Sequence, residues 1–354
     1  MSSLHNPDKE SRAGAFLRSS VPERKIPIFF TFDKNYCVPA AVSFFSLLNK
    51  TKPGVFWEMF VLHSDIDRDS EQKIRKCLSG FFNYSLSFIN TENFLKTEWQ
   101  KGNWDGHQFK RQFTSDAVCR CFGARFFPQY DKIIYSDVDV IFTEDVSRLI
   151  DTDLKQNYLA AVKNPFLKYS RAELSHLSPE HYEKFKNTYF AGGIWILNLK
   201  KIRESDLEKR MLEIIEDNAV IKKWPDQDIM NIACDNRVTY LPLNYISYPY
   251  LLDLIKSRNF ISHYSENELY DSILNPKIIH YAAGKPWQGK SFCYEPWYAV
   301  YYSLKLDLLF PDFAVSFTKS EVKKLKKNIR KYKKLFLFAS VLCAVSAAVV
   351  IFLL

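Results

Sequence analysis

The stretch 131-DKIIYSDVDVIFTED-145 decides the fold class, because an apolar run leads directly into two acids that are separated by one residue. The run IIY at 133–135 is typical of a strand covered on both faces, as in the middle of a parallel sheet. Alternate residues of a strand point the same way, so Asp137 and Asp139 would face one side. Like charges that close repel each other, and partial burial strengthens the repulsion. We therefore expect a positive group between the two acids.

Strands and helices alternate along the chain around this stretch. Strands are expected where apolar runs end in polar turns, and helices where apolar residues recur at helical spacing. The alternation predicts an α/β fold with a mostly parallel central sheet. Besides the acidic strand, the expected strands are 25–33, 55–65, 84–90, 189–202 and 277–280; the expected helices are 39–51, 67–80, 114–130, 203–217 and 225–236, and 91–113 is expected to be irregular.

The positive charge of the chain is concentrated in one segment. The 354 residues carry a net charge of +9, which by itself suggests a nucleic-acid partner. The segment 323-KKLKKNIRKYKK-334, however, holds eight Lys or Arg and no acid, which leaves about +1 for the rest of the chain. Because the basicity is local and not a property of the domain, we expect no nucleic-acid partner.

The last twenty residues are expected to attach the chain to a membrane. The run 335-LFLFASVLCAVSAAVVIFLL-354 has no charged side chain, and twenty helical residues span about 30 Å, the thickness of the hydrocarbon core. The basic run before it favours anionic lipid on the cytoplasmic side, so residues 323–354 are expected to bind an anionic membrane surface. A helix packed into a protein core is the alternative. The sequence leaves open whether the segment spans the bilayer or lies in one leaflet.

Composition also indicates the compartment and the domain boundaries. Seven cysteines, an odd number without a Cys-x-x-Cys pair, fit reduced thiols in the cytosol better than a disulfide framework. We expect four parts: a flexible tail at 1–24, a catalytic domain at 25–320, a polybasic membrane-surface segment at 321–334 and a hydrophobic membrane segment at 335–354.

Polar side chains from widely separated segments are expected at one edge of the sheet. Asp33 and His280 each end an expected strand, as Asp137 and Asp139 do, and ligands of open α/β sheets bind beyond such carboxyl ends. Two carboxylates and an imidazole could hold a small divalent cation, with phosphate oxygens and water completing an octahedron. Such a cation would relieve the repulsion between the acids and polarise a leaving diphosphate.

Five motifs follow one another between residue 26 and about residue 300. They are 31-TFDKNYCVP-39, 133-IIYSDVDV-140, 189-YFAGGIWILNLKK-201, 225-PDQDIMN-231 and 279-IHYAAGKPW-287. In this order they resemble the motifs of glycosyltransferase family 8, which includes glycogenin and bacterial lipopolysaccharide galactosyl- and glucosyltransferases. Five ordered motifs are far more specific than an Asp-x-Asp alone.

The resemblance implies a GT-A fold, a UDP-hexose donor, a Mn²⁺ or Mg²⁺ ion, and hexose transfer with retention at the anomeric carbon. The acceptor would be a glycan or glycolipid, such as one related to lipopolysaccharide, at the cytosolic face of the membrane. The resemblance also carries over site residues. These are Asp33, Asn35, Tyr36, Arg120, Asp137, Val138, Asp139, Gly284 and Lys285 for the nucleotide sugar, Asp137, Asp139 and His280 for the metal, and Asp226 and Gln227 for catalysis.

The same resemblance assigns roles to individual side chains. Tyr36 would stack on the base, Lys285 would neutralise diphosphate charge, and Arg120 would lie near the donor. Asp226 would hydrogen-bond donor hydroxyls, and Gln227 would lie near the β face of the anomeric carbon. The leaving UDP develops negative charge, so a metal ion and a lysine beside it would stabilise the transition state electrostatically.

Two departures from the family pattern bear on the donor. Ala191 stands where related enzymes commonly carry Asn, so the identity of the donor sugar stays open. The loop from His280 to Lys285 is one residue shorter than the common pattern, which leaves open how Gly284 and Lys285 meet the diphosphate.

Other interpretations also stay open. A metal-dependent nucleotidyl- or phosphoryl-transfer enzyme would carry a Gly-rich loop after the first strand, and 32-FDKNYCVP-39 has no glycine. A membrane-tethered, non-catalytic sugar-binding protein would have lost the acidic pair or His280, and all three are present. A transferase could use front-face attack or a two-step route through Gln227 or a neighbouring acid. Taken singly, each residue also has an ordinary explanation, such as ring packing for Tyr36.

Overall fold

The computed structural model describes residues 24–101, 118–165, 174–217, 223–256, 263–289 and 293–313. The predicted tail at 1–24 lies outside these residues, apart from Arg24, which begins the first strand. The predicted basic and apolar segments at 321–334 and 335–354 also lie outside them. None of the helices within the described ranges has the length and apolar character that crossing a bilayer requires.

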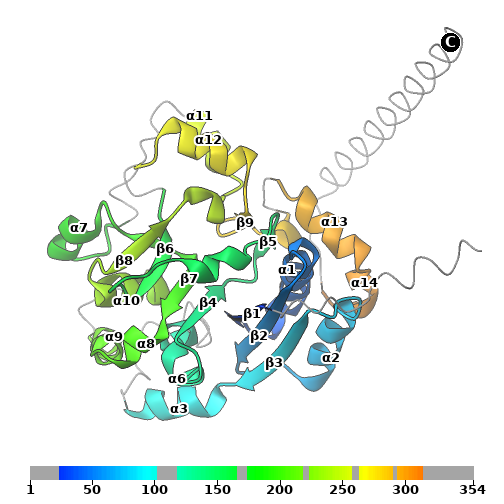
Figure 1. Ribbon diagram of the computed structural model, residues 1–354, viewed down its shortest axis with the longest axis horizontal. Helices are drawn as coiled ribbons and strands as arrows, with labels where there is room; N and C mark the ends of the chain where they lie inside the picture. Colours follow the sequence, from blue (N-terminus) through cyan, green and yellow to red (C-terminus); the bar gives the residue numbers. More distant parts are fainter. Residues whose placement is uncertain are drawn as a thin grey trace, which may run out of the picture.

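A seven-stranded sheet runs through the middle of the described part of the chain (Figure 1). Its strands are β1 (Arg24–Thr31), β2 (Val55–His63), β3 (Tyr84–Asn90), β4 (Lys132–Ser136), β6 (Leu159–Lys163), β7 (Phe190–Asn198) and β8 (Val238–Leu241). Their spatial order is β3-β2-β1-β4-β7-β6-β8. Within this sheet β7 runs antiparallel to β4 and β6, whereas the other neighbouring pairs are parallel. The predicted α/β class with a mostly parallel sheet is confirmed.

Two short strands, β5 (Val140–Phe142) and β9 (Ile278–His280), form a separate antiparallel sheet. The prediction that His280 ends a strand is therefore confirmed, but this strand does not belong to the central sheet. His280 reaches the strand ends through its pairing with β5, which continues the acidic stretch. The rule about the carboxyl ends of parallel strands therefore applies to Asp33 and Asp137 but not to His280.

Helices cover both faces of the sheet, and the strand before the acids is buried between them. Ile134 belongs to one apolar core and Ile133 and Tyr135 to the other, and all three are fully buried. The strand is thus covered on both faces, as its sequence predicts. The first core includes residues of α1 (Cys37–Lys50), α2 (Arg68–Cys77), α11 (Leu251–Lys256), α12 (Glu266–Leu274), α13 (Glu295–Ser303) and α14 (Leu306–Leu309); the second includes residues of α6 (Gly123–Phe126), α8 (Leu199–Arg203), α9 (Leu207–Glu216) and α10 (Pro225–Cys234).

Two predicted elements differ from the structure. The segment expected to be irregular contains a helix, α3 (Glu92–Lys101), because Asn90 accepts a hydrogen bond from the Glu92 N–H at its start and Phe94 packs on Phe122 and Phe126. The helix expected at 114–130 is interrupted, with a 3₁₀ turn at Arg120–Phe122 before α6. Phe94 thus packs one side of α3 against the helical segment that follows.

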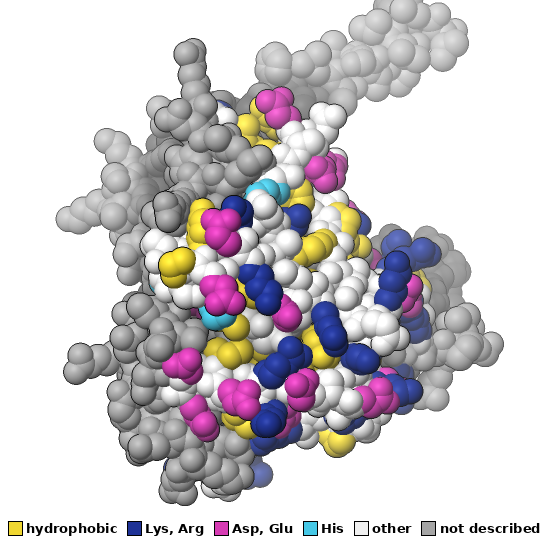
Figure 2. Space-filling model, turned by 90° about the vertical axis from the view of Figure 1, so that its left-hand side faces the viewer, with side chains coloured by type: hydrophobic (Ala, Val, Ile, Leu, Met, Phe, Trp, Pro, Cys, Tyr) yellow, Lys and Arg dark blue, Asp and Glu magenta, His cyan; other side chains and the backbone are white. Residues whose placement is uncertain are grey.

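Charged side chains of both signs are interspersed on the face that carries α7 (Pro179–Phe185) and α9 (Figure 2). Lys184 of α7 pairs with Asp235. A continuous basic stripe, the usual footprint of a nucleic-acid-binding surface, is not seen among the described side chains of this face.

A buried carboxylate holds the beginning of α10. Asp228 is fully buried, accepts hydrogen bonds from the Tyr189 hydroxyl and, at 2.9 Å, from the Trp224 backbone N–H, and lies 3.0 Å from Nε2 of His176. A buried charge is tolerated only when it is paired and hydrogen-bonded. These contacts fix the first turn of α10, which carries Asp226 and Gln227.

Asp228→Ala should lower the free energy of unfolding by about 3 kcal/mol, because one buried and two partly buried groups lose their common partner. Urea denaturation measures the change. Asp69→Ala is the matched control: Asp69 is also near a helix start, but its side chain is 71% exposed and pairs with Lys73 on its own helix. Exposed ion pairs contribute little, so equal losses in the two variants would contradict the assigned role of Asp228.

Candidate functional site

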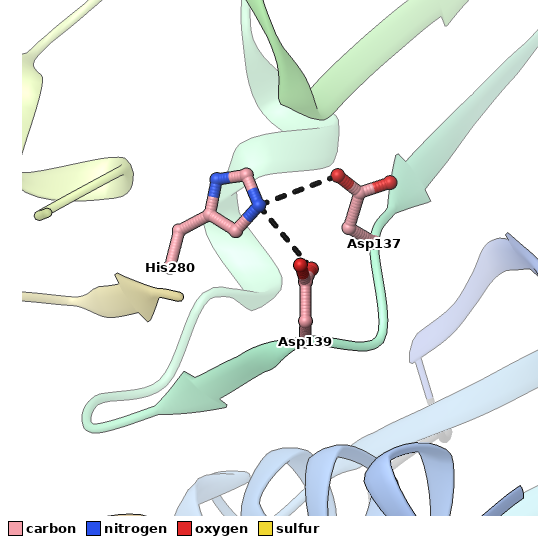
Figure 3. Close-up of side chains that lie close together, drawn as sticks. All are labelled: Asp137, Asp139 and His280. Carbon is pink, nitrogen blue, oxygen red and sulfur yellow. Dashed lines mark ion pairs between the residues drawn. The ribbon is translucent and has the colours of Figure 1, made fainter. Parts of the chain in front are cut away.

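The two acids of the opening stretch and His280 meet at one point (Figure 3). Asp137 and Asp139 lie between β4 and β5, and His280 is the last residue of β9. Nε2 of His280 lies 3.4 Å from Oδ2 of Asp137 and 3.2 Å from Oδ1 of Asp139. One ligand atom from each residue lies within 4.8 Å of the others. Within the described ranges, no other group of three His, Cys, Asp or Glu is arranged to hold a metal ion.

Backbone hydrogen bonds hold these segments together. The antiparallel pairing of β5 with β9 places Val140 opposite His280. The Tyr281 N–H donates to the carbonyl of Asp139 at 2.9 Å, and the Asp137 N–H donates to the carbonyl of Gly193 at 3.0 Å. The site is therefore built on sheet hydrogen bonds between distant parts of the sequence.

The acids converge through a bend and not through strand alternation. β4 ends at Ser136 and β5 begins at Val140, so neither acid lies in a strand. Val138, between them, is buried in the core and anchors the bend. Both carboxylates lie near Nε2 of His280, so the prediction that they face the same side is confirmed. The reason given for it, the two-residue period of a strand, is wrong.

The expected positive group between the acids is supplied by side chains of the protein. Nη1 of Arg120 lies 2.7 Å from Oδ1 of Asp137, and Nζ of Lys285 forms an ion pair with Asp139. Burial acts to raise the pKa of each acid, but the charges of Arg120 beside Asp137, of Lys285 beside Asp139 and of His280 outweigh it. The pKa of each acid therefore lies below its usual value, and both are ionised at neutral pH.

His280 adds a third positive charge. Burial lowers the pKa of its imidazole, but the charges of Asp139 and Asp137 and the hydrogen bonds to them raise the pKa to about 9. The ring therefore carries a proton at neutral pH beside the two acids, and a cation that binds Nε2 would displace this proton. Each of the three cationic groups comes from a different segment of the chain.

Arg120 also joins the acidic bend to the fourth motif, whose Gln227 in turn contacts the third. Its Nη1 lies 3.1 Å from Oδ2 of Asp226 as well as 2.7 Å from Asp137. Burial raises the pKa of Asp226, and the charge of Arg120 opposes this rise. The next side chain, Gln227, accepts a hydrogen bond from the Gly192 N–H at 2.8 Å. Arg120 thus pairs with two acids of the motifs, Asp137 and Asp226.

The residues predicted for the nucleotide lie along the same edge. Asp33 caps a 3₁₀ turn at Lys34–Tyr36 by accepting from the Asn35 N–H at 2.9 Å. The Tyr36 ring meets the Trp287 ring edge-on at 5.8 Å. Gly284, next to Lys285 in the chain, is partly buried. Burial raises the pKa of the Tyr36 hydroxyl, and the positive charge of Lys285 opposes this rise. These contacts bring the predicted residues together, and their roles toward a nucleotide stay predictions.

The donor set fits a small, hard divalent cation. Two carboxylates and one imidazole are the ligands that Mn²⁺ and Mg²⁺ sites use, with open positions left for phosphate and water. The ligand atoms already lie within 4.8 Å of one another, and both acids are ionised. Asp137, Asp139 and His280 could therefore hold such an ion without rearrangement of the backbone.

Sequence reasoning missed two residues at this site. Tyr248 packs against the His280 ring, with ring centroids 5.6 Å apart. Gly193 lies so close to the same ring that a Cβ atom there would be 2.5 Å from Nδ1 of His280. A glycine inside a strand signals a close approach, so the Gly192-Gly193 pair could have revealed the second contact. No sequence signal pointed to Tyr248.

The sequence is similar to curated glycosyltransferases over most of its length. It is 24% identical over 260 residues to lipopolysaccharide 1,2-glucosyltransferase of Escherichia coli, which covers 72% of this chain and 71% of the relative. It is 22% identical over 276 residues to lipopolysaccharide 1,3-galactosyltransferase of Salmonella typhimurium, covering 75% and 74%.

The fold is similar to that of solved GT-A glycosyltransferases. The galactosyltransferase LgtC, solved in complex with donor and acceptor sugar analogues, aligns with a TM-score of 0.60 and 20% identity over 84% of this chain and all of LgtC. The bifunctional glycosyltransferase WbbM aligns with a TM-score of 0.66 and 22% identity over 84% of this chain and 53% of WbbM. The expected GT-A fold is confirmed. The family profile of glycosyl transferase family 8 matches residues 27–291, and the chain belongs to that family.

Proposed function

We propose that this chain is a metal-dependent, retaining hexosyltransferase that moves a hexose from a UDP-sugar to a glycan or glycolipid. The observation that carries the proposal is the convergence of Asp137, Asp139 and His280 on one point. The names of its relatives, lipopolysaccharide glucosyl- and galactosyltransferases, support an acceptor related to lipopolysaccharide. A nucleotidyltransferase is less well supported, because the turn after β1 offers no glycine-rich phosphate loop.

The electrostatics of the site suit a departing nucleoside diphosphate. A divalent cation bound by the three ligands would offset the negative charge that develops on the diphosphate. Lys285 and Arg120 lie beside the two acids and add positive charge from the protein itself. Both are largely buried, so their fields act with little screening by water.

The contacts of Gln227 and Asp226 favour front-face attack over a two-step route. The Gln227 side-chain oxygen already accepts the Gly192 N–H, and the Asp226 carboxylate is paired with Arg120. Both groups are thus engaged by the protein, and an amide is a weak nucleophile. We therefore assign Gln227 and Asp226 to orienting the donor hexose, with the leaving phosphate accepting the proton of the acceptor hydroxyl.

We further propose that the enzyme works at the cytosolic face of a membrane. The support is the sequence of residues 323–354, in which a run of eight basic residues precedes twenty uncharged ones. Confining enzyme and lipid-linked acceptor to one surface would raise their effective concentration.

A screen of UDP-glucose, UDP-galactose and their N-acetylated forms should identify one donor that the full chain hydrolyses in the presence of Mn²⁺. Chelation should remove the activity and added Mn²⁺ should restore it, because the cation offsets the leaving-group charge. The hexose released first should keep the α configuration of the donor, as ¹H NMR of the anomeric proton shows. A β product would contradict retention, and turnover unchanged by chelation would contradict metal dependence.

Asp139→Asn should reduce this turnover by about 100-fold or more, because it removes one anionic ligand and the partner of Lys285. Asp131→Asn is the matched control, since Asp131 lies just before β4, the strand that leads into the acidic bend, but its side chain is 77% exposed. Thermal unfolding checks that both variants are folded. A folded Asp139→Asn enzyme with wild-type turnover would refute the site.

Removal of residues 335–354 should leave binding to anionic vesicles that is lost at high salt, because only the basic segment then remains. Removal of residues 323–354 should abolish binding to these vesicles. Co-sedimentation with vesicles of neutral and of anionic lipid measures both effects. If the full chain does not sediment with either kind of vesicle, the proposed membrane attachment is wrong.

A further inference from the structure

The second ring nitrogen of His280, Nδ1, is buried and has no hydrogen-bond partner among the described residues. Histidines that bind metals usually donate this second N–H to a carboxylate or a backbone carbonyl, which fixes the orientation of the ring. Here Nε2 points at Asp137 and Asp139, while Nδ1 has no such protein partner in the described ranges. The orientation of the ring must therefore come from other contacts.

Gly193 supplies one of these contacts by leaving room for the ring. A Cβ atom at this position would lie 2.5 Å from Nδ1, 2.6 Å from Cε1 and 3.3 Å from Cγ of His280. The backbone of Gly193 is not in the left-handed region, which Gly54 and Gly289 occupy, so space and not conformation demands a glycine. Its carbonyl also accepts the Asp137 N–H at 3.0 Å. One residue thus touches one metal ligand and holds the backbone of another.

Tyr248 supplies the second contact. It is buried, and its ring lies 5.6 Å from the imidazole, centroid to centroid, at an angle of 36°. The neighbouring Ser247 fixes this arrangement, because its carbonyl accepts the His280 N–H at 2.8 Å and its own N–H donates to Ile278 at 2.8 Å. The tyrosine ring is therefore tied to the strand that carries the histidine.

We propose that Gly193 and Tyr248 are positioning residues that aim Nε2 of His280 at the cation by packing, in place of a hydrogen bond at Nδ1. The inference rests on the proposed metal-dependent function. If these residues served only the stability of the core, their replacement would lower the unfolding temperature without changing the affinity of the folded protein for metal.

The test is the dissociation constant of Mn²⁺ for the full chain in the presence of UDP, measured by EPR of the free ion. Gly193→Ala and Tyr248→Leu should each weaken Mn²⁺ binding about tenfold or more, the usual effect of losing an orienting contact. Tyr248→Phe keeps the ring and should bind Mn²⁺ as the wild type does. A weakened Tyr248→Phe would show that the hydroxyl matters and not the packing, and would overturn the proposal.

Two control variants separate positioning from stability. Gly80→Ala adds a Cβ atom where no atom lies within 4 Å, and Tyr301→Ala removes a buried tyrosine that stacks on Trp297 in α13. Both should keep the wild-type affinity for Mn²⁺, although Tyr301→Ala should unfold at a lower temperature. If Tyr301→Ala loses as much affinity as Tyr248→Leu, the role of Tyr248 is structural and the proposal fails.

The outcomes also separate this inference from the proposed function. A wild-type chain that does not bind Mn²⁺ would refute the metal site and the inference with it. A wild-type chain that binds Mn²⁺ while folded Gly193→Ala and Tyr248→Leu bind it equally well would refute the inference alone. If Gly193→Ala does not fold, the comparison of Tyr248→Leu with Tyr248→Phe decides.

Discussion

The organisation of this protein depends on the repulsion between two carboxylates, one buried and one partly buried, that are held close together. Asp137 and Asp139 approach the same ring nitrogen, and neither could stay ionised there without compensation. Compensation comes from Arg120, His280 and Lys285, which belong to three separate segments. The chain therefore brings a 3₁₀ turn, a second sheet and a loop to one point. The pairing of β5 with β9, outside the central sheet, is what places His280 there.

The sequence was sufficient for the fold class because its apolar runs have clear periods. The run at 133–135 is buried on both faces, as its composition indicates, and the expected strands occur in the expected order. Two strands of the central sheet, β6 and β8, were not predicted. It was insufficient for α3, because Phe94 is buried against partners elsewhere in the chain, Phe122 and Phe126. A pattern within one segment holds no information about such partners.

The residues of the site that lie in motifs were also predictable from the sequence, whereas those that depend on contacts between distant segments were not. Motif spacing identified Asp137, Asp139 and His280, and the structure brings all three together. Lys285 was predicted to face a diphosphate, and its ion pair with Asp139 was not predicted. A lysine in a sequence does not by itself show which negative group it will contact. Tyr248 had no signal at all, because its contact with the histidine depends on pairing between backbone segments that no local pattern encodes.

Arg120 places a constraint on how this sequence can change over generations. A single guanidinium neutralises Asp137 and Asp226 and lies 4.7 Å above the Tyr135 ring, so the bend and α10 share one counterion. Replacing the arginine would strand two buried anions at once, whereas replacing either acid would leave the arginine with the other. Substitutions at Arg120, Asp137 and Asp226 are therefore not independent of one another. Lineages that change one of them should carry a compensating change at a second, so an alignment should show this triad as a covarying unit.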